Sequence, residues 1–167
     1  GLPHLNPFAR DDEDYPLGIG PEGKPGGTIR LLEDENGDGK IDRATMFAEG
    51  LRFPTSAAPW NGGVLVTAPT EIIFLKDTNG DRKADYREVL FRGFTLGVTD
   101  SNVNGLRWGL DNRVHGVNGG NGGRIASTRA PGAPVSLQNL DFSFAPGTGE
   151  FATTYETSGG FGLGATP

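Results

Sequence analysis

Two acidic loops in this sequence carry the residue types that bind a calcium ion. The first reads Asp-Glu-Asn-Gly-Asp-Gly-Lys-Ile-Asp over residues 34–42, and the second reads Asp-Thr-Asn-Gly-Asp-Arg-Lys-Ala-Asp over residues 77–85. Calcium takes about six to eight oxygen ligands, and a loop that supplies them from positions 1, 3, 5, 7 and 9 can surround one ion. The expected ligands are Asp34, Asn36, Asp38, the backbone carbonyl of Lys40 and Asp42 in the first loop, and Asp77, Asn79, Asp81, the backbone carbonyl of Lys83 and Asp85 in the second.

The twelfth position of each loop decides whether a bidentate carboxylate closes the coordination of the ion. It is Thr45 in the first loop and Glu88 in the second, so we expect Glu88 to be a further ligand. Position six is Gly39 in the first loop but Arg82 in the second, which weakens the sharp turn there. The alternative is structural, because Asp, Asn and Gly also form turns by bonding to their own backbone. Two loops in the same register, each crowding three aspartates, favour a counter-ion.

Catalytic candidates are few. Of the two histidines, His4 and His115, the second lies in an expected strand without an obvious partner in sequence, which favours a structural role over a catalytic one. Asp100, Asn102 and Asn104 could face a ligand, although the two asparagines also suit turns. Asp100 and His115 are therefore the candidate bases.

The acidic loops belong to an internal repeat of about 43 residues. Residues 28–50 and 71–93 align without a gap, and the aspartates, asparagine and glycine of the first loop recur in the second. The match continues past the loops, where residues 47–51 align with residues 90–94. Such a period indicates a fold built from repeated supersecondary units.

The segments between the turns have the length and composition of short strands, and none carries a useful helical stripe. Four short antiparallel strands in each unit of about 40–50 residues are typical of a β-propeller blade. We therefore predict an all-β chain. The expected strands cover residues 28–32, 44–48, 54–59, 64–68, 71–76, 86–91, 106–109, 114–118, 141–145 and 151–155.

The whole chain, residues 1–167, is expected to be a fragment of one propeller domain. It supplies the outer half of one blade, a full unit, and a longer third unit over residues 104–157, in which a glycine-rich insertion (residues 119–132) separates the second and third strands. Those units make about three blades, whereas propellers close with about four to eight. Further blades are thus expected from sequence outside this chain.

Composition excludes several classes of protein. The sequence has no cysteine, so disulfides, a thiolate nucleophile and an attached haem are ruled out within it. Its formal net charge of −6 disfavours a nucleic-acid partner. Its apolar runs are too short to span a membrane, and its first residues do not read as a secretion signal.

Several motifs, taken together, resemble those of one protein family. They are Asp14-Tyr15-Pro16, residues 27–42, Phe53-Pro54-Thr55 and residues 62–66, 104–112, 134–137 and 141–144. Over about residues 12–163 the chain resembles the bacterial membrane-bound dehydrogenase β-propellers, distant relatives of the quinoprotein glucose and sorbosone dehydrogenases. The resemblance implies a six-bladed propeller exported to the periplasm, the cell surface or the medium, often followed by a c-type haem domain. It also implies oxidation of a sugar or aldehyde, with hydride transfer to pyrroloquinoline quinone and a histidine as base.

The sequence departs from this pattern at the expected base. In the quinoprotein relatives the histidine precedes the strand that corresponds to residues 105–109, but residues 99–104 contain none. Two hypotheses follow. The chain is part of a quinone-dependent oxidoreductase and inactive by itself, or it is part of a non-catalytic, calcium-stabilised propeller that binds glycans or protein partners.

Overall fold

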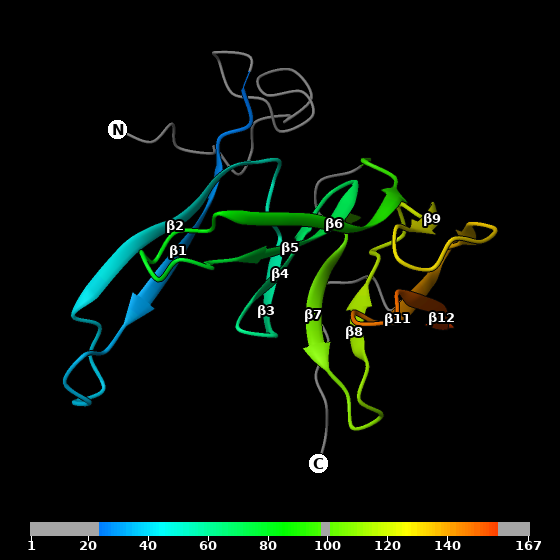
Figure 1. Ribbon diagram of the computed structural model, residues 1–167. Helices are drawn as coiled ribbons and strands as arrows, with labels where there is room; N and C mark the ends of the chain where they lie inside the picture. Colours follow the sequence, from blue (N-terminus) through cyan, green and yellow to red (C-terminus); the bar gives the residue numbers. More distant parts are fainter. Residues whose placement is uncertain (1–23, 98–100, 157–167) are drawn as a thin grey trace.

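The computed structural model describes residues 24–97 and 101–156, and these residues form antiparallel β-strands and loops without an α-helix (Figure 1). The predicted all-β class is confirmed. In the described part of the chain no helix is long and apolar enough to cross a membrane. The strands are β1 (Gly27–Glu33), β2 (Arg43–Leu51), β3 (Ser56–Trp60), β4 (Gly63–Ala68), β5 (Glu71–Lys76), β6 (Tyr86–Phe94), β7 (Asn104–Trp108), β8 (Val114–Val117), β9 (Gly123–Ser127), β10 (Val135–Ser136), β11 (Leu140–Ala145) and β12 (Glu150–Glu156).

Three open sheets contain these strands. β1 and β2 form a two-stranded sheet, a six-stranded sheet has the order β10-β9-β6-β5-β4-β3, and a four-stranded sheet has the order β12-β11-β8-β7. Two four-stranded antiparallel meanders are present, one made of β3 to β6 and the other of β7, β8, β11 and β12. Both were expected from the sequence.

The glycine-rich insertion contains a strand that the sequence does not predict. β9 lies inside the insertion and β10 follows it, and both extend the sheet of the preceding meander rather than their own. β9 pairs with β6, with Ser127 opposite Phe91 and Ala126 opposite Arg92. Local pattern does not predict this strand, because Ile125, its one large apolar residue, follows a glycine-rich run and lies between Arg124 and Ala126. Its pairing with β6 therefore determines it.

Local chemistry fixes the tight turn between β3 and β4. Asn61 and Gly62 both have positive φ angles, 48° and 72°, and Trp60 pairs with Gly63 across the turn. Two central residues with positive φ suit the right-handed twist of a two-residue hairpin, and Asn-Gly is the pair that adopts them most readily. The hairpin predicted at this position is confirmed.

The sheets stack face to face with two apolar cores between them. β4 and β5 are apolar on both faces because alternate residues enter different cores: the Leu65–Phe74 pair enters one and the Val66–Ile73 pair enters the other. The first core joins the six-stranded and four-stranded sheets, and the second joins the six-stranded sheet to the β1–β2 hairpin. The residues 43 positions apart in the repeat therefore occupy adjacent layers.

Phenylalanine rings dominate the core between the two larger sheets. Phe91 and Phe94 of β6 contact Phe142, Phe144 and Phe151 of β11 and β12, with ring centroids 5.0–6.2 Å apart. Burying one such ring is worth about 1.5–3 kcal/mol, so this cluster is a main contribution to the joining of the sheets.

The first strands of the two meanders lie side by side. The indole of Trp108 on β7 donates to the carbonyl of Pro59 on β3 (3.0 Å), and the amide of Leu106 donates to the hydroxyl of Ser56 (2.9 Å). These bonds hold β7 against β3, an edge strand of the six-stranded sheet.

Candidate functional site

The first acidic loop, between β1 and β2, is closed by hydrogen bonds from its own backbone. The carboxylate of Asp34 accepts from the amides of Gly37 (2.7 Å) and Gly39 (2.8 Å) and more weakly from that of Asp38 (3.3 Å). The side-chain oxygen of Asn36 accepts from the amide of Asp38 (2.9 Å). The loop thus wraps around the side chain of its first residue.

The last acidic residue of this loop ties its end to its beginning. Asp42 accepts from the amide of Glu35 (2.9 Å), and its own amide donates to the carbonyl of Glu33 (2.9 Å). Asp38 accepts from the amide of Lys40 (2.8 Å).

The second acidic loop, between β5 and β6, repeats this pattern. Asp77 accepts from the amides of Gly80 (2.7 Å) and Arg82 (2.8 Å), as Asp34 does from the equivalent residues. Asp85 accepts from both the amide and the hydroxyl of Thr78 (2.7 Å each). Two further bonds match the first loop, from the amide of Asp81 to Asn79 (2.9 Å) and from the amide of Lys83 to Asp81 (2.9 Å).

These bonds favour the ionised carboxylates. The amide of Gly39, with smaller contributions from Gly37 and Asp38, lowers the pKa of Asp34. At Asp77 desolvation raises the pKa, but the combined backbone amides, first that of Gly80, outweigh it and the pKa is lowered. The hydrogen bonds from Thr78 lower the pKa of Asp85. All three groups therefore hold a negative charge at neutral pH.

The donor set of each loop suits a hard cation, because it consists of carboxylate, amide and carbonyl oxygens. The Oδ2 atoms of Asp34 and Asp77 each accept one backbone bond and keep a second lone pair. Within residues 24–97 and 101–156, however, no three His, Cys, Asp or Glu side chains converge as a preformed metal cluster. An ion would have to draw these side chains inward and use the Asn and backbone oxygens as well.

A charge network joins the two loops. Arg82 lies 2.9 Å from the carboxylate of Glu33 and 3.9 Å from that of Glu35, while Arg43 lies 2.8 Å from Glu35. Arg82 occupies the glycine position of the second loop with a φ of 68°, so the turn is kept despite the substitution. Since Glu33 and Arg82 are 49 positions apart, spacing along the chain gave no signal of this contact.

Glu88, expected as the closing ligand of the second loop, has other partners. Its carboxylate accepts from Arg129 at 2.5 and 2.7 Å and from the hydroxyl of Tyr86 at 2.8 Å. The Arg129 hydrogen bond is the main cause that lowers the pKa of Glu88. Arg129 also donates to the carbonyl of Pro146 (3.0 Å) and lies 5.4 Å from the ring centre of Trp60. A calcium ion would have to break this ion pair to bind Glu88.

His115 has a hydrogen-bond partner, Asp111, that its position in the sequence does not reveal. Its Nε2 lies 3.0 and 3.1 Å from the carboxylate oxygens of Asp111, across the β7–β8 turn, and this bond lowers the pKa of Asp111. Gly109 leaves the space for the pair, because a Cβ there would lie 2.7 Å from His115 Nε2. The neighbouring Ser143 accepts from Arg113 (3.1 Å). The pair ties the β7–β8 turn to the start of β8.

The asparagines near the start of β7 take part in hydrogen bonds between loop residues. Asn102 is buried and accepts from Asn121 (3.0 Å), and its backbone carbonyl accepts from Asn104 (2.9 Å). The Nδ2 of Asn102 has no partner in the described part of the chain. Asn118, also buried, donates to the carbonyls of Leu137 and Gln138. Asp100, the other candidate base, lies outside the described residues.

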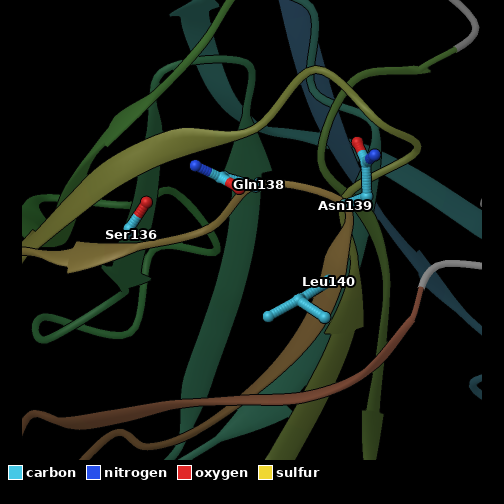
Figure 2. A pocket seen from close by; sticks show the side chains of 4 residues that line it. All are labelled: Ser136, Gln138, Asn139 and Leu140. Carbon is cyan, nitrogen blue, oxygen red and sulfur yellow. The ribbon is translucent and has the colours of Figure 1, made fainter.

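A hollow of about 450 Å³ lies at the connection between β10 and β11 (Figure 2). Its described lining is Ser136, Gln138, Asn139 and Leu140. This lining offers hydroxyl and amide groups to a neutral ligand but no ionisable side chain that could act as an acid or base.

Comparison with known proteins gives one match. No curated protein and no solved structure matches the chain. A family model matches residues 9–166, which cover nearly the whole sequence and all of the strands described above. The chain therefore belongs to the family described as "Domain of unknown function (DUF7133)".

Proposed function

We propose that this chain is a calcium-stabilised segment of a β-propeller, in which successive four-stranded units stack around a common axis and each acidic loop binds one ion. The observation that carries the proposal is the repetition of one hydrogen-bonded loop at an offset of 43 residues, with the same donor–acceptor pairs in both copies. Three stacked layers, the β1–β2 hairpin and two meanders, are what three consecutive blades would contribute.

The residues that would hold the ions are those of positions 1, 3, 5, 7 and 9. They are Asp34, Asn36, Asp38, the Lys40 carbonyl and Asp42 in the first loop, and Asp77, Asn79, Asp81, the Lys83 carbonyl and Asp85 in the second. When bound, calcium would offset two of the three carboxylate charges on each loop and fix the turn between two strands. Its effect would be structural.

Calcium binding is tested by calorimetric titration and thermal melting with calcium or with EDTA. An ion that binds only the folded chain stabilises it by RT ln(1 + [L]/Kd), about 2.7 kcal/mol when calcium exceeds Kd a hundredfold. Two sites are expected, with one lost in Asp34→Asn and the other in Asp77→Asn. Asp111→Asn removes a carboxylate outside the loops and serves as the matched control. If the melting temperatures with calcium and with EDTA are equal, neither loop binds calcium and both are self-bonded turns.

A second proposal concerns the complete protein and rests on the family resemblance of motifs such as residues 104–112. We propose that it is an exported oxidoreductase-like propeller that acts on sugars or aldehydes with pyrroloquinoline quinone, and that a haem domain accepts its electrons. The quinone, when bound, would take up the hydride. In the described residues, Arg82, Arg113 and Arg129 already pair with carboxylates, so these residues do not form a set for an anionic quinone.

Activity is tested by reduction of a dye with an aldose donor, calcium and added quinone. The chain by itself is expected to be inactive, because hydride transfer requires cofactor, base and substrate in one geometry, worth roughly 7–11 kcal/mol of the barrier. Turnover by the isolated chain would contradict this and point to Asp100 or His115 as the base. Glycan or protein binding without turnover would favour the non-catalytic alternative.

A further inference from the structure

Six of the ten asparagines in this sequence are followed directly by glycine, and all six Asn-Gly pairs lie in the described part of the chain. An asparagine loses its side-chain amide most readily before glycine, which has no side chain to block the reaction. The glycine nitrogen attacks Cγ of the asparagine, the new N–C bond closes a succinimide ring, and Nδ2 leaves as ammonia with the proton of the glycine amide. Water then opens the ring to aspartate or isoaspartate.

Hydrogen bonds hold the attacking nitrogens of the pairs in the two acidic loops. The amide of Gly37 donates to Asp34 and that of Gly80 donates to Asp77, at 2.7 Å in each case. To attack, the nitrogen must lose its proton and leave its carboxylate partner, and the negative charge of that partner opposes the loss of the proton. The Asn-Gly pairs of both loops are therefore protected while the loops stay closed.

The three pairs in the third unit are also held. Asn118 is buried, and its side chain accepts from the amide of Gly122 (3.2 Å). The same bond occupies the nitrogen that would attack Asn121. Asn104 is partly buried and donates to the backbone carbonyl of Asn102 (2.9 Å). Burial and hydrogen bonds therefore restrict all three pairs.

The pair in the β3–β4 turn is the exception. Asn61 and Gly62 are both exposed, and the pairing across the turn uses their neighbours Trp60 and Gly63. In the part of the chain that the structure describes, no hydrogen bond holds the side chain of Asn61. A Cβ built on Gly62 would lie 3.6 Å from Nζ of Lys76, so an ammonium group lies beside the turn and favours loss of the Gly62 amide proton.

We propose that Asn61 is the site of deamidation in the folded chain, and that the carboxylates of Asp34 and Asp77 protect the same dipeptide in the acidic loops. Isoaspartate at this position would add a methylene carbon to the backbone of a two-residue turn, whose geometry depends on two positive φ angles. It would also shift Trp60, whose ring centroid lies 4.6 Å from that of Phe74. The modification would thus loosen the β3–β4 hairpin as the protein ages.

Calcium has no part in this inference, so it is tested in EDTA with the full 167-residue chain. After warm incubation at neutral pH, trypsin releases three of the pairs in separate peptides, residues 31–40, 53–76 and 77–82, and mass spectrometry measures the deamidated fraction of each. We expect Asn61 to react about tenfold faster than Asn36 or Asn79, because only the loop pairs must break a hydrogen bond to a charged group. In urea the three rates should become similar.

Two variants of the first loop test the protection. Asp34→Ala frees the amide of Gly37, so Asn36 should react about tenfold faster while the second loop keeps its rate. Asp38→Ala is the matched control, because it removes a carboxylate of the same loop that bonds to the amide of Lys40. It should leave the rate at Asn36 nearly unchanged.

Asn61→Gly tests the consequence for the hairpin, because Gly-Gly also suits this turn but has no side-chain amide to lose. Aged samples of the unmodified chain should show altered tryptophan emission and a lower melting temperature, whereas aged Asn61→Gly should keep both. Three results would overturn the proposal: Asn36 or Asn79 reacts as fast as Asn61 in the folded chain, Asn61 persists for as long as the urea-unfolded chain takes to deamidate, or Asp34→Ala leaves Asn36 protected.

Discussion

The guanidinium of Arg82 lies 2.9 Å from the carboxylate of Glu33, so the turn of the second acidic loop is tied to the end of the strand that leads into the first. The amide of Arg82 meanwhile donates to Asp77 within its own loop. One residue therefore closes its own turn through its backbone and contacts the neighbouring layer through its side chain.

Two substitutions at Arg82 separate these effects. Arg82→Ala keeps a residue with a Cβ at a φ of 68° and loses the ion pair, so we expect a loss of about 0.5–1 kcal/mol. Arg82→Gly loses the same pair but relieves a left-handed backbone that costs a non-glycine residue about 1 kcal/mol. Its stability should thus stay within about 0.5 kcal/mol of the unmodified chain.

Urea unfolding in EDTA measures both variants. The deficit of Arg82→Ala should shrink at 1 M NaCl, where the Debye length falls to about 3 Å. A deficit that is independent of salt would mean that packing of the arginine stem, and not its charge, joins the loops.

Acid should destabilise the loops in a defined direction. Asp34, Asp77 and Asp85 have folded-state pKa values below their ordinary values, so they bind protons less readily when folded than when unfolded. Their contribution is present above the unfolded pKa of about 4 and is lost as the pH falls through the folded values. Melting temperatures between pH 3 and pH 7 should therefore drop below about pH 4.

The variant Asp34→Asn checks the cause of this acid sensitivity. Its side-chain oxygen can still accept a hydrogen bond but no longer titrates, so its melting temperature should be lower at pH 7 and depend less on pH below 4. Glu49→Gln, on an exposed position of β2, is the control. An identical pH profile for Asp34→Asn and the unmodified chain would assign the acid sensitivity to other carboxylates.

The ion pair of Glu88 with Arg129 is expected to stabilise the contact between β6 and the turn that follows β9. Both side chains are about one quarter exposed, so either single substitution leaves a partly buried charge without its partner. Glu88→Gln or Arg129→Met should cost about 1–3 kcal/mol, and the double variant should cost less than the sum. Emission from Trp60 should also change in Arg129→Met, because the guanidinium stacks on the indole.

The same substitution tests the role of Glu88 as a calcium ligand. If Arg129 keeps the carboxylate, Glu88→Gln should leave the calcium affinity of the second loop within about twofold, since only a lost ligand costs more. A tenfold weaker second site, with the first site unchanged, would place Glu88 on the ion as the sequence predicts.

Features set by neighbouring residues could be predicted from the sequence, and features set by distant pairing could not. The Asn61-Gly62 turn and the strands β4 and β5 follow from local conformational preference and from short apolar runs. Contacts between residues far apart in the sequence leave no such local pattern, so they could not be predicted. Ile125 is the one large apolar residue of β9 and follows a glycine-rich run, so a strand there depends on pairing with the edge of β6.

The candidate site shows the same division. The Asp and Asn spacing predicted two calcium-binding loops, with self-bonded turns as the alternative. Both loops close on their own side chains, and calcium binding stays a prediction. The partners of Glu88 and Arg82 come from 41 and 49 positions away and depend on how the layers stack. His115 is a different case, because Asp111 is only four positions away but reaches it by way of a turn rather than a helical face.

The insertion should detach from the six-stranded sheet when Gly93 gains a side chain. Gly93 has a φ of 105°, and a Cβ there would overlap the backbone carbonyl of Arg124 on β9. Backbone atoms of a paired strand cannot move aside as a flexible side chain can, so we expect Gly93→Ala to cost about 2–4 kcal/mol.

Gly37→Ala is the matched control, because its φ of 78° is also positive but a Cβ there meets open space. It should cost only about 1–2 kcal/mol. Hydrogen exchange locates the damage: in Gly93→Ala the amides of β9 should lose protection while those of β4 and β5 keep theirs. Equal costs for the two alanine variants, with β9 still protected, would show that β6 and β9 can separate slightly without losing their pairing.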